Sequence, residues 1–276
     1  MSAPLRLDRS IIRVAGPDAR PFLQGLLTQN VERLGDAPAY AGLLSPQGKV
    51  VADMILWPRS DGVLIDADAA RGPDLLRRLT LYKLRSAVEI EDASAHHIVL
   101  VGDAPFTGAV ADPRFPGGEL GWRALVAAAN AGDYRPDDGA DAARRTALGV
   151  PDLARDAEPE EVFALEALFE ELHGVDFHKG CFVGQENVSR MKRRATTRRK
   201  FCPIAFEGPA PPHGAPIRAG EVDLGTVRSG IEGRALALLR LDRALDADAP
   251  LSCDGRPVRL DPPPWLILPE RAEETR

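Results

Sequence analysis

The carboxy-terminal part of the chain, from Phe201 onward, restricts the fold more than any other stretch. Its apolar runs are interrupted at short intervals by Pro203, Gly208, Pro209, Pro211, Pro212, Gly214, Pro216 and Gly220. Because proline removes a backbone donor and cannot continue a helix, such runs fit short strands joined by turns. Residues 224–229 and 235–240 have the composition of strands. This spacing predicts a small β-barrel or sandwich over residues 201–276.

Residues 1–200 alternate instead between the two kinds of element. Runs rich in β-branched residues predict strands at 10–15, 51–57, 63–66 and 98–101. The second and third of these strands flank a turn at Ser60–Gly62 and predict a hairpin. Apolar residues at helical spacing predict helices at 18–27, 73–84, 140–148 and 162–172. We expect the acidic segment 152–161 to form an exposed loop.

Length, charge and cysteine content exclude several classes of protein. A chain of 276 residues is long enough for two or three structural units, and a formal charge of −6 argues against a general nucleic-acid-binding coat. Cys181, Cys202 and Cys253 lie far apart, which predicts neither a disulfide framework nor a metal site held by this chain alone. Since no stretch could span a bilayer and no signal-peptide pattern precedes the first strand, we expect a cytoplasmic protein with no membrane partner. We also expect the chain to be a monomer.

The segment from His178 to Glu186 contains the strongest chemical pattern. Its two glycines predict a shaped loop and not a regular helix or strand. A thiol becomes a nucleophile or metal ligand as the thiolate, which cationic neighbours favour, so Lys179 and His178 are candidates for activating Cys181. The alternative, that Cys181 is an inert small apolar residue, stays open at this point.

Two further segments suggest binding. Trp122 and Arg123 follow a glycine at the start of a predicted strand, and an aromatic wall beside a fixed donor suits a flat ligand; the alternative is a core tryptophan covered by an arginine. Residues 190–200 contain seven bases and no acid. This run fits a charged strand edge or linker, or a site for the glutamate tail of a small ligand, an anionic protein or a phosphate backbone. The run contains no aromatic residue, which makes stacking with single-stranded RNA the weakest option.

The pattern Lys-Gly-Cys-Phe-x-Gly-Gln-Glu at 179–186 resembles the signature of the YgfZ-type folate-binding proteins, a family related to the T-protein aminomethyltransferase of glycine cleavage. Segments at Gly16, Gly48, Gly121 and Gly225 extend the resemblance over nearly the whole chain. It implies an α+β fold of the T-protein kind, with two interleaved α+β modules in residues 1–200 and a carboxy-terminal barrel in 201–276. It also implies tetrahydrofolate or a derivative as cofactor, and iron–sulfur enzymes or cluster carrier proteins as partners.

The resemblance also assigns roles to residues. It implies a reactive or transient-ligand role for Cys181, a thiolate-stabilising role for Lys179, and folate or loop contacts for Trp122, Arg123, Asp53, Gln185 and Glu186. The implied function is a folate-dependent accessory factor in the assembly or repair of iron–sulfur clusters, with only an indirect effect on tRNA modification.

Two other functions stay open. One is a folate-dependent C1 transferase of the aminomethyl type. Ala52 replaces the first of two adjacent acids of the T-protein, and the chemistry needs a correctly placed carboxylate, so the resemblance does not by itself make the chain an enzyme. The other is a non-catalytic interaction module with a vestigial pocket, in which the basic run docks a partner.

Overall fold

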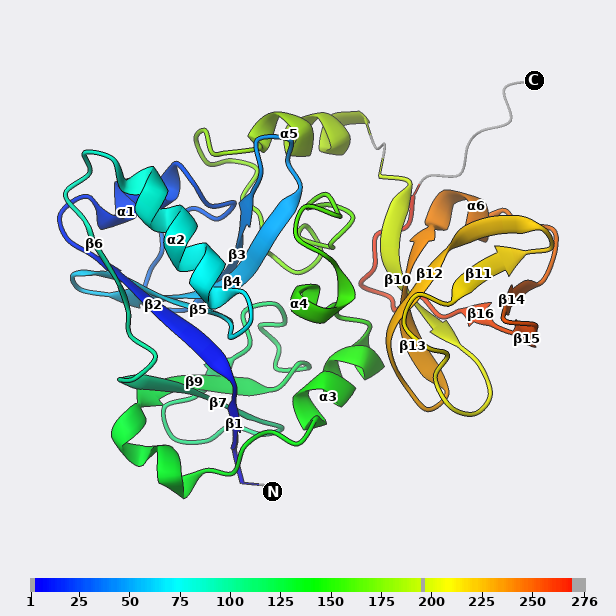
Figure 1. The fold of residues 1–276 in the computed structure, drawn as a ribbon, viewed down its shortest axis with the longest axis horizontal. Coiled ribbons are helices and arrows are strands. Elements are labelled where there is room, and N and C mark those ends of the chain that lie inside the picture. The colour runs from blue at the N-terminus through cyan, green and yellow to red at the C-terminus, as the bar shows by residue number, and fades with distance from the viewer. Residues whose placement is uncertain (1–2, 195–196, 270–276) are drawn as a thin grey trace. The chain divides into compact units, whose positions relative to one another are not determined.

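The computed structural model describes residues 3–194 and 197–269 (Figure 1). The chain forms two compact units. The first contains residues 1–139, 159–161 and 172–185, and the second contains residues 140–158, 162–171 and 186–276. The expected boundary near residue 201 stays a prediction. No helix of the described residues is both long enough and apolar enough to cross a membrane.

The first unit is built on a five-stranded antiparallel sheet with the strand order β3-β4-β5-β2-β6. The strands are β2 (Arg9–Ala15), β3 (Ala39–Leu44), β4 (Val50–Arg59), β5 (Gly62–Asp68) and β6 (Glu89–Asp92). β4 and β5 form the predicted hairpin, with Arg59 paired to Gly62. The register places Ile12, Met54 and Ile65 on one face and Ile11, Ile55 and Asp66 on the other, because side chains alternate along a strand.

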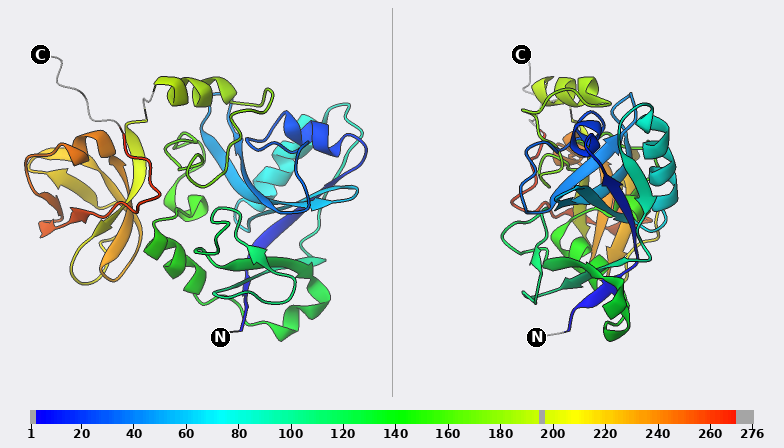
Figure 2. Two further views of the ribbon diagram at one scale, coloured as in Figure 1. Left: turned by 180° about the vertical axis from the view of Figure 1, so that it is seen from behind. Right: turned by 90° about the vertical axis from the view of Figure 1, so that its left-hand side faces the viewer.

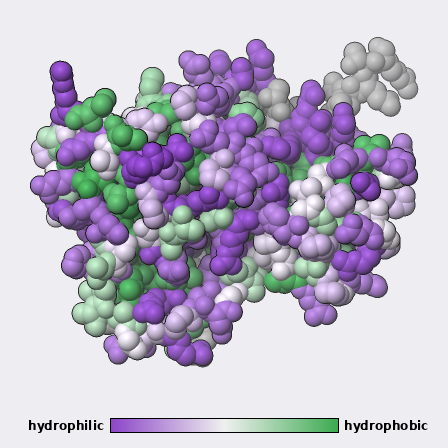
Figure 3. Space-filling model, in the orientation of Figure 1, coloured by the Kyte–Doolittle hydropathy of each residue, from purple (hydrophilic) through white to green (hydrophobic). Residues whose placement is uncertain are grey.

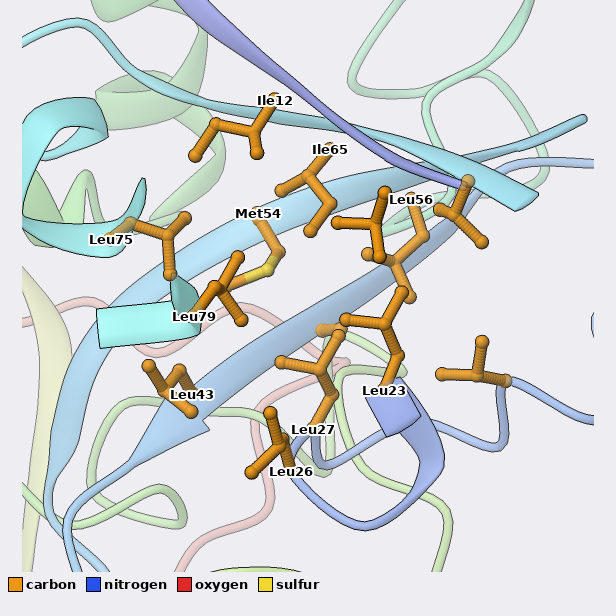
Figure 4. Close-up of a cluster of buried hydrophobic side chains, with 14 of the residues drawn as sticks. Ile12, Leu23, Leu26, Leu27, Leu43, Met54, Leu56, Ile65, Leu75 and Leu79 are labelled. Carbon is orange, nitrogen blue, oxygen red and sulfur yellow. The ribbon is translucent and has the colours of Figure 1, made fainter. Parts of the chain in front are cut away.

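The apolar face of this sheet carries the core of the first unit. Helices α1 (Ala19–Gln24) and α2 (Gly72–Lys83) contribute Leu23, Leu75 and Leu79 to a buried cluster with Met54 and Ile65 (Figure 4). Each fully buried leucine or isoleucine contributes about 1.5–3 kcal/mol to stability. The helices predicted at 18–27 and 73–84 are therefore confirmed, the first in a shorter form.

A second sheet of the first unit has four antiparallel strands in the order β1-β7-β9-β8. They are β1 (Leu5–Leu7), β7 (His97–Gly102), β8 (Val110–Ala111) and β9 (Trp122–Ala127), and a short 3-10 helix, η1 (Ala128–Asp133), follows. The register pairs Arg123 with Val101 and Val110, so these three side chains share one face. The strand predicted after Gly121 is confirmed.

The second unit contains a seven-stranded, near-closed barrel with the order β15-β14-β11-β12-β13-β10-β16 (Figure 1, Figure 2). The strands are β10 (Arg199–Ala205), β11 (Pro216–Ala219), β12 (Val222–Ile231), β13 (Arg234–Arg240), β14 (Leu251–Cys253), β15 (Arg256–Pro257) and β16 (Arg259–Leu260). Helices of the same unit are α3 (Ala140–Leu148), α4 (Leu153–Asp156), α5 (Gln185–Arg194) and α6 (Leu241–Leu245). The barrel expected from the proline and glycine spacing is confirmed.

Two expectations about local structure are wrong. Residues 162–172 form turns instead of a helix, and Leu168 has a φ of 63°. The apolar residues of this segment are buried at successive positions, among them Leu165, Ala167 and Phe169. A left-handed residue interrupts a right-handed helix, because its carbonyl points out of the helical hydrogen-bond pattern. The acidic segment 152–161 is not a wholly exposed loop, because it contains α4 and because Asp156 is buried and accepts hydrogen bonds from the Asp152 and Ser229 N–H groups. The basic run at 190–200 contains the end of α5 and the start of β10, so the alternatives given for it stay open.

Candidate functional site: a pinned loop with an exposed thiol

Cys181 lies on a loop of the first unit that runs from Leu172 to Gly184 and ends where α5 begins. The Cys181 thiol is exposed, whereas the two other cysteines, Cys202 and Cys253, are buried in the barrel. A Cβ added at Gly180 would meet no atom within 4 Å, so the space beside Gly180 is open. The predicted loop is confirmed as far as Gly184, whereas its last two residues, Gln185 and Glu186, belong to α5.

Lys179 anchors this loop to the interior of the first unit. Its side chain is 7% exposed, and its Nζ donates to the carbonyl oxygens of Gln24 at 2.7 Å, Leu27 at 2.5 Å and Gln29 at 2.8 Å. These three acceptors match the three protons of a lysine ammonium. Nζ also lies 5.0 Å from the centre of the Phe182 ring. Burial lowers the pKa of Lys179 to about 8.

The predicted thiolate-stabilising role of Lys179 stays a prediction. The contacts of the ammonium make this lysine an anchor that joins the loop to the segment after α1. Its position in the sequence gave no sign of this, because the three carbonyls lie about 150 residues away along the chain.

Backbone and side-chain hydrogen bonds join the same two segments at further points. The Thr28 hydroxyl donates to the Gly174 carbonyl at 2.5 Å and accepts from the Gly42 N–H at 2.8 Å. The Gln29 amide donates to the His173 carbonyl at 2.9 Å, and the Val183 N–H donates to the Gly25 carbonyl at 3.2 Å. Each such bond contributes about 0.5–1.5 kcal/mol, so together they hold the loop firmly against the α1 region.

Gly184 fixes the far end of the loop. It has a φ of 83°, and a Cβ at this position would lie 2.6 Å from the Ser45 carbonyl oxygen and 2.9 Å from the Gly48 Cα. Both the backbone conformation and the close approach therefore require glycine here. The Pro-Gln-Gly-Lys turn at 46–49 thus forms the surface on which the end of the Cys181 loop rests.

Gln185 and Glu186 follow as the first residues of α5. The Gln185 N–H donates to the Phe182 carbonyl at 3.2 Å, and the Gln185 side chain is half-buried. Glu186 is exposed. Their predicted contacts with a folate stay predictions.

The other predicted binding residues lead to a buried network of charges in the first unit. Asp66, which is 0% exposed, accepts from Arg9 Nε at 2.5 Å and from Arg123 Nη1 at 2.6 Å. Arg123 Nε lies 3.1 Å from Asp112 Oδ2, without the alignment of a hydrogen bond. Arg114 forms a two-pronged pair with Asp112 at 2.9 and 2.8 Å. Burial alone would raise the pKa of Asp112, but Arg114 and Arg123 outweigh it and hold that pKa well below its usual range.

Tyr40 extends this network to Asp53. The Arg114 guanidinium lies 5.6 Å from the centre of the Tyr40 ring, and the Tyr40 hydroxyl donates to Asp53 Oδ2 at 3.0 Å. Burial and the adjacent Asp53 raise the pKa of Tyr40 well above its ordinary value. The polar network therefore joins Asp53 and Arg123, two residues that the resemblance placed near one ligand.

These contacts bear on which residues could face a folate. Arg123 is 2% exposed and its charge is already shared between two carboxylates, so a ligand could reach its guanidinium only by displacing one of them. Trp122 and Asp53 are half-buried, and the Trp122 ring lies against Gly118, where a Cβ would come within 3.4 Å of the ring. Arg123 does not fit a direct contact, whereas Trp122 and Asp53 have surface available for one.

Ala52 and Asp53 point to opposite faces of the five-stranded sheet. Ala52 is 5% exposed and belongs to the apolar core cluster, whereas Asp53 contacts Tyr40 on the polar face. A second acid at position 52 would therefore lie in the apolar core. The sequence did not identify Asp66 on the polar face, although an acid within an apolar strand is itself a signal of a buried partner.

The described residues contain no group of three or more His, Cys, Asp or Glu side chains placed to hold a metal ion. A cluster or metal ion that reaches Cys181 would thus need ligands from elsewhere, since structural sites usually take four. The local chemistry is that of one accessible thiol on a firmly held loop.

Comparison with known proteins places the chain in a family. The human mitochondrial iron–sulfur cluster assembly factor IBA57 is 31% identical over 283 residues, which cover 86% of this chain and 77% of the human protein. The chain belongs to the IBA57 family. The Neurospora crassa member is 33% identical over 239 residues, and the match covers 74% of this chain and 54% of that protein. The chain thus spans about half the length of this fungal relative.

Two further findings agree with this family. Residues 198–267 match the model of the CAF17 carboxy-terminal β-barrel domain. The glycine cleavage aminomethyltransferase T of Bartonella henselae has the same fold, with a TM-score of 0.77 and 14% identity over 96% of this chain and 87% of the enzyme. The resemblance to the YgfZ-type family and the α+β fold of the T-protein kind are both confirmed. The IBA57 relatives are named as mitochondrial proteins, and the cytoplasmic location of this chain stays a prediction.

Proposed function

We propose that this IBA57-family chain acts in iron–sulfur cluster assembly by offering the Cys181 thiolate as one ligand to a cluster that a partner protein also holds. The observation that carries the proposal is the exposed thiol on a loop fixed by Lys179 and Gly184. The cluster is the cargo, and its other ligands come from the partner. When Cys181 binds iron, its thiol gives up its proton to solvent and an S–Fe bond forms. The group that held that position on the iron, either a water molecule or a side chain of the partner protein, is released.

The fixed loop matters for such an exchange. A thiol held in one position loses little further conformational freedom when it binds, so the entropic cost of ligation is reduced. The open space beside Gly180 leaves room for a partner surface to approach the sulfur. We further propose that any effect on tRNA modification is indirect and acts through iron–sulfur enzymes that modify tRNA.

The test is complementation of cells that lack the native gene. We expect Cys181→Ala to lose most iron–sulfur enzyme activity at normal protein abundance. Cys253→Ala serves as the matched control because it removes a buried thiol of the barrel and leaves the loop unchanged. Full enzyme activity with Cys181→Ala would refute the proposal.

We also propose that the first unit binds tetrahydrofolate or a derivative, with Trp122 and Asp53 as direct contacts and Arg123 as the residue that holds the polar network in place. The fold shared with an aminomethyltransferase and the half-buried positions of Trp122 and Asp53 support this. When bound, a folate supplies a carrier of one-carbon groups. Isothermal titration with tetrahydrofolate tests the idea: Trp122→Ala should weaken binding about tenfold or more, and no heat of binding up to about 1 mM with the native chain would refute it.

A further inference from the structure

In the structure, six of the seven bases in the run at 190–200 form two groups, and the seventh, Arg198, is exposed and lies near Asp242. Three of the bases in the run are ion-paired to glutamates of the turn segment 162–171: Lys192 to Glu170, Arg199 to Glu166 and Lys200 to Glu171. Lys200 is buried, as is the side chain of its partner. These pairs hold parts of the second unit together, and they account for the charge of those three bases.

The second group is different. Arg190, Arg193 and Arg194 are exposed residues of α5, and we call them the arginine face. At about 100° per residue they lie within an arc of about 100°, opposite Val188, the buried residue of the helix. Among the described residues, Arg190 contacts the amide oxygen of Asn187 and Arg193 contacts a backbone carbonyl, and no carboxylate pairs with any of the three.

The arginine face is not explained by the stability of α5 alone. Bases in the last turn of a helix interact favourably with its carbonyl end, which accounts for Arg193 and Arg194. Arg190 lies a turn earlier, and it is three and four residues from two like charges, a spacing that destabilises a helix. In a chain with a net charge of −6, three unpaired arginines on one helix face suit an external anion.

We propose that the arginine face of α5 docks a carboxylate-rich surface of a partner protein. The guanidinium group binds carboxylates through two parallel N–H donors, and three such groups on one helix present them to a single surface. The absence of an aromatic residue in 185–200 disfavours bases as ligands, and the net negative charge disfavours a phosphate backbone. The inference rests on the proposed function, because α5 starts four residues after Cys181 and the docked protein would be the one that shares the cluster.

The first experiment measures binding of a dye-labelled ten-residue polyglutamate peptide to the full chain by fluorescence anisotropy. We expect Arg190→Glu, Arg193→Glu and Arg194→Glu together to weaken binding at least about tenfold, because each exposed ion pair contributes a few-fold to affinity. The matched control reverses three exposed arginines elsewhere, Arg33, Arg218 and Arg243, and changes the net charge by the same amount. The control should stay within about threefold of the native chain, and native binding should weaken as salt rises from about 0.05 to 0.3 M.

Two outcomes would overturn the proposal. One is equal loss of peptide binding in the reversed chain and in the control, which would reduce the effect to net charge. The other is tighter binding of a ten-nucleotide single strand than of the peptide through the same arginines, which would make the face a nucleic-acid site.

A second experiment separates this proposal from the proposed function. In cells that lack the native gene, the reversed chain should lose iron–sulfur enzyme activity while its Cys181 still reacts with iodoacetamide at the native rate. If reversal leaves enzyme activity intact and Cys181→Ala abolishes it, the docking proposal fails and the proposed function stands. If Cys181→Ala is fully active while reversal still abolishes peptide binding and activity, the proposed function fails and the docking surface stands.

Discussion

Replacing Lys179 by methionine tests whether this lysine anchors the Cys181 loop. Methionine keeps an unbranched apolar side chain of similar length and removes all three N–H donors. The Leu27 carbonyl bond is wholly buried, and those of Gln24 and Gln29 are partly buried. An orphaned buried acceptor costs about 1–3 kcal/mol, and acceptors that regain water cost less. We therefore expect the free energy of unfolding to fall by about 3 kcal/mol at pH 7.

The pH dependence of this loss has a defined sign. Burial lowers the pKa of Lys179 to about 8 in the folded chain, against 10.5 for the ordinary side chain, despite the opposing effect of Asp176 and Glu32. Between these two values the unfolded state binds more protons, so the stability of the native chain rises with pH relative to the methionine variant. The difference between the two proteins should be constant below about pH 7 and should grow by about 1 kcal/mol between pH 7 and pH 9.

The assay is urea unfolding followed by circular dichroism at both pH values. The control is Lys83→Met, which changes a half-buried lysine in the last turn of α2 and should alter stability by less than about 0.5 kcal/mol. The alkylation rate of Cys181 reports on the loop itself. It should change in Lys179→Met and stay at the native value in Lys83→Met. A loss below about 1 kcal/mol, or a difference that shrinks as the pH rises, would refute the anchoring role.

Three other predictions follow from the site. Iodoacetamide should label Cys181 rapidly and leave Cys202 unlabelled in the folded chain, because burial raises the pKa of Cys202 to about 12; equal labelling by mass spectrometry would contradict this. Gly184→Ala should lower the free energy of unfolding by about 1–3 kcal/mol, since its Cβ would lie 2.6 Å from a carbonyl oxygen, whereas Gly180→Ala should be nearly neutral. A larger loss of stability in Gly180→Ala than in Gly184→Ala would contradict this description of the loop. Asp66→Asn should cost about 3–5 kcal/mol because it leaves two arginines without their shared carboxylate, and a near-native midpoint of unfolding would show that the network is not held by this charge.

Local sequence patterns predicted the β4–β5 hairpin, α2 and α3, and the structure contains all three close to the expected residues. Helix α2 buries the apolar residues Leu75 and Leu79, whereas the buried residues of α3 are Asp141 and Thr146. The barrel followed from proline and glycine spacing, which forbids long elements whatever the tertiary contacts are. These features depend on neighbours in the sequence, and that is why they could be read from it.

Two segments show where this reading fails. The apolar residues of the segment 162–172 have helical spacing, but they are buried at successive positions and not along one face. Tertiary packing therefore determines the backbone conformation of this segment. Helix α5 has one buried residue, Val188, among charged ones and therefore no apolar stripe to recognise. In both cases the surrounding structure, and not local propensity, determines the conformation.

The candidate site was only partly accessible to sequence reasoning for a related reason. The motif at 179–186 identified the loop and its thiol. The partners of its charged residues lie far away in the chain, with Lys179 bound to carbonyls near α1 and Arg123 bound to Asp66, a residue 57 positions earlier. A sequence motif can indicate a buried charged residue, but the residue that pairs with it is identified only from the folded structure.

One alternative role for an exposed cysteine is that of a nucleophile that completes a reaction within its own chain. Such a nucleophile needs a base within hydrogen-bond reach and donors for the developing charge. Here the nearest lysine in the sequence donates its three protons to carbonyls, and no group of metal ligands assembles among the described residues. The structure instead fixes the loop on both sides of the thiol and leaves the thiol itself open. Under the proposed function, Cys181 would be one half of a site, and a second molecule would bring the remaining ligands.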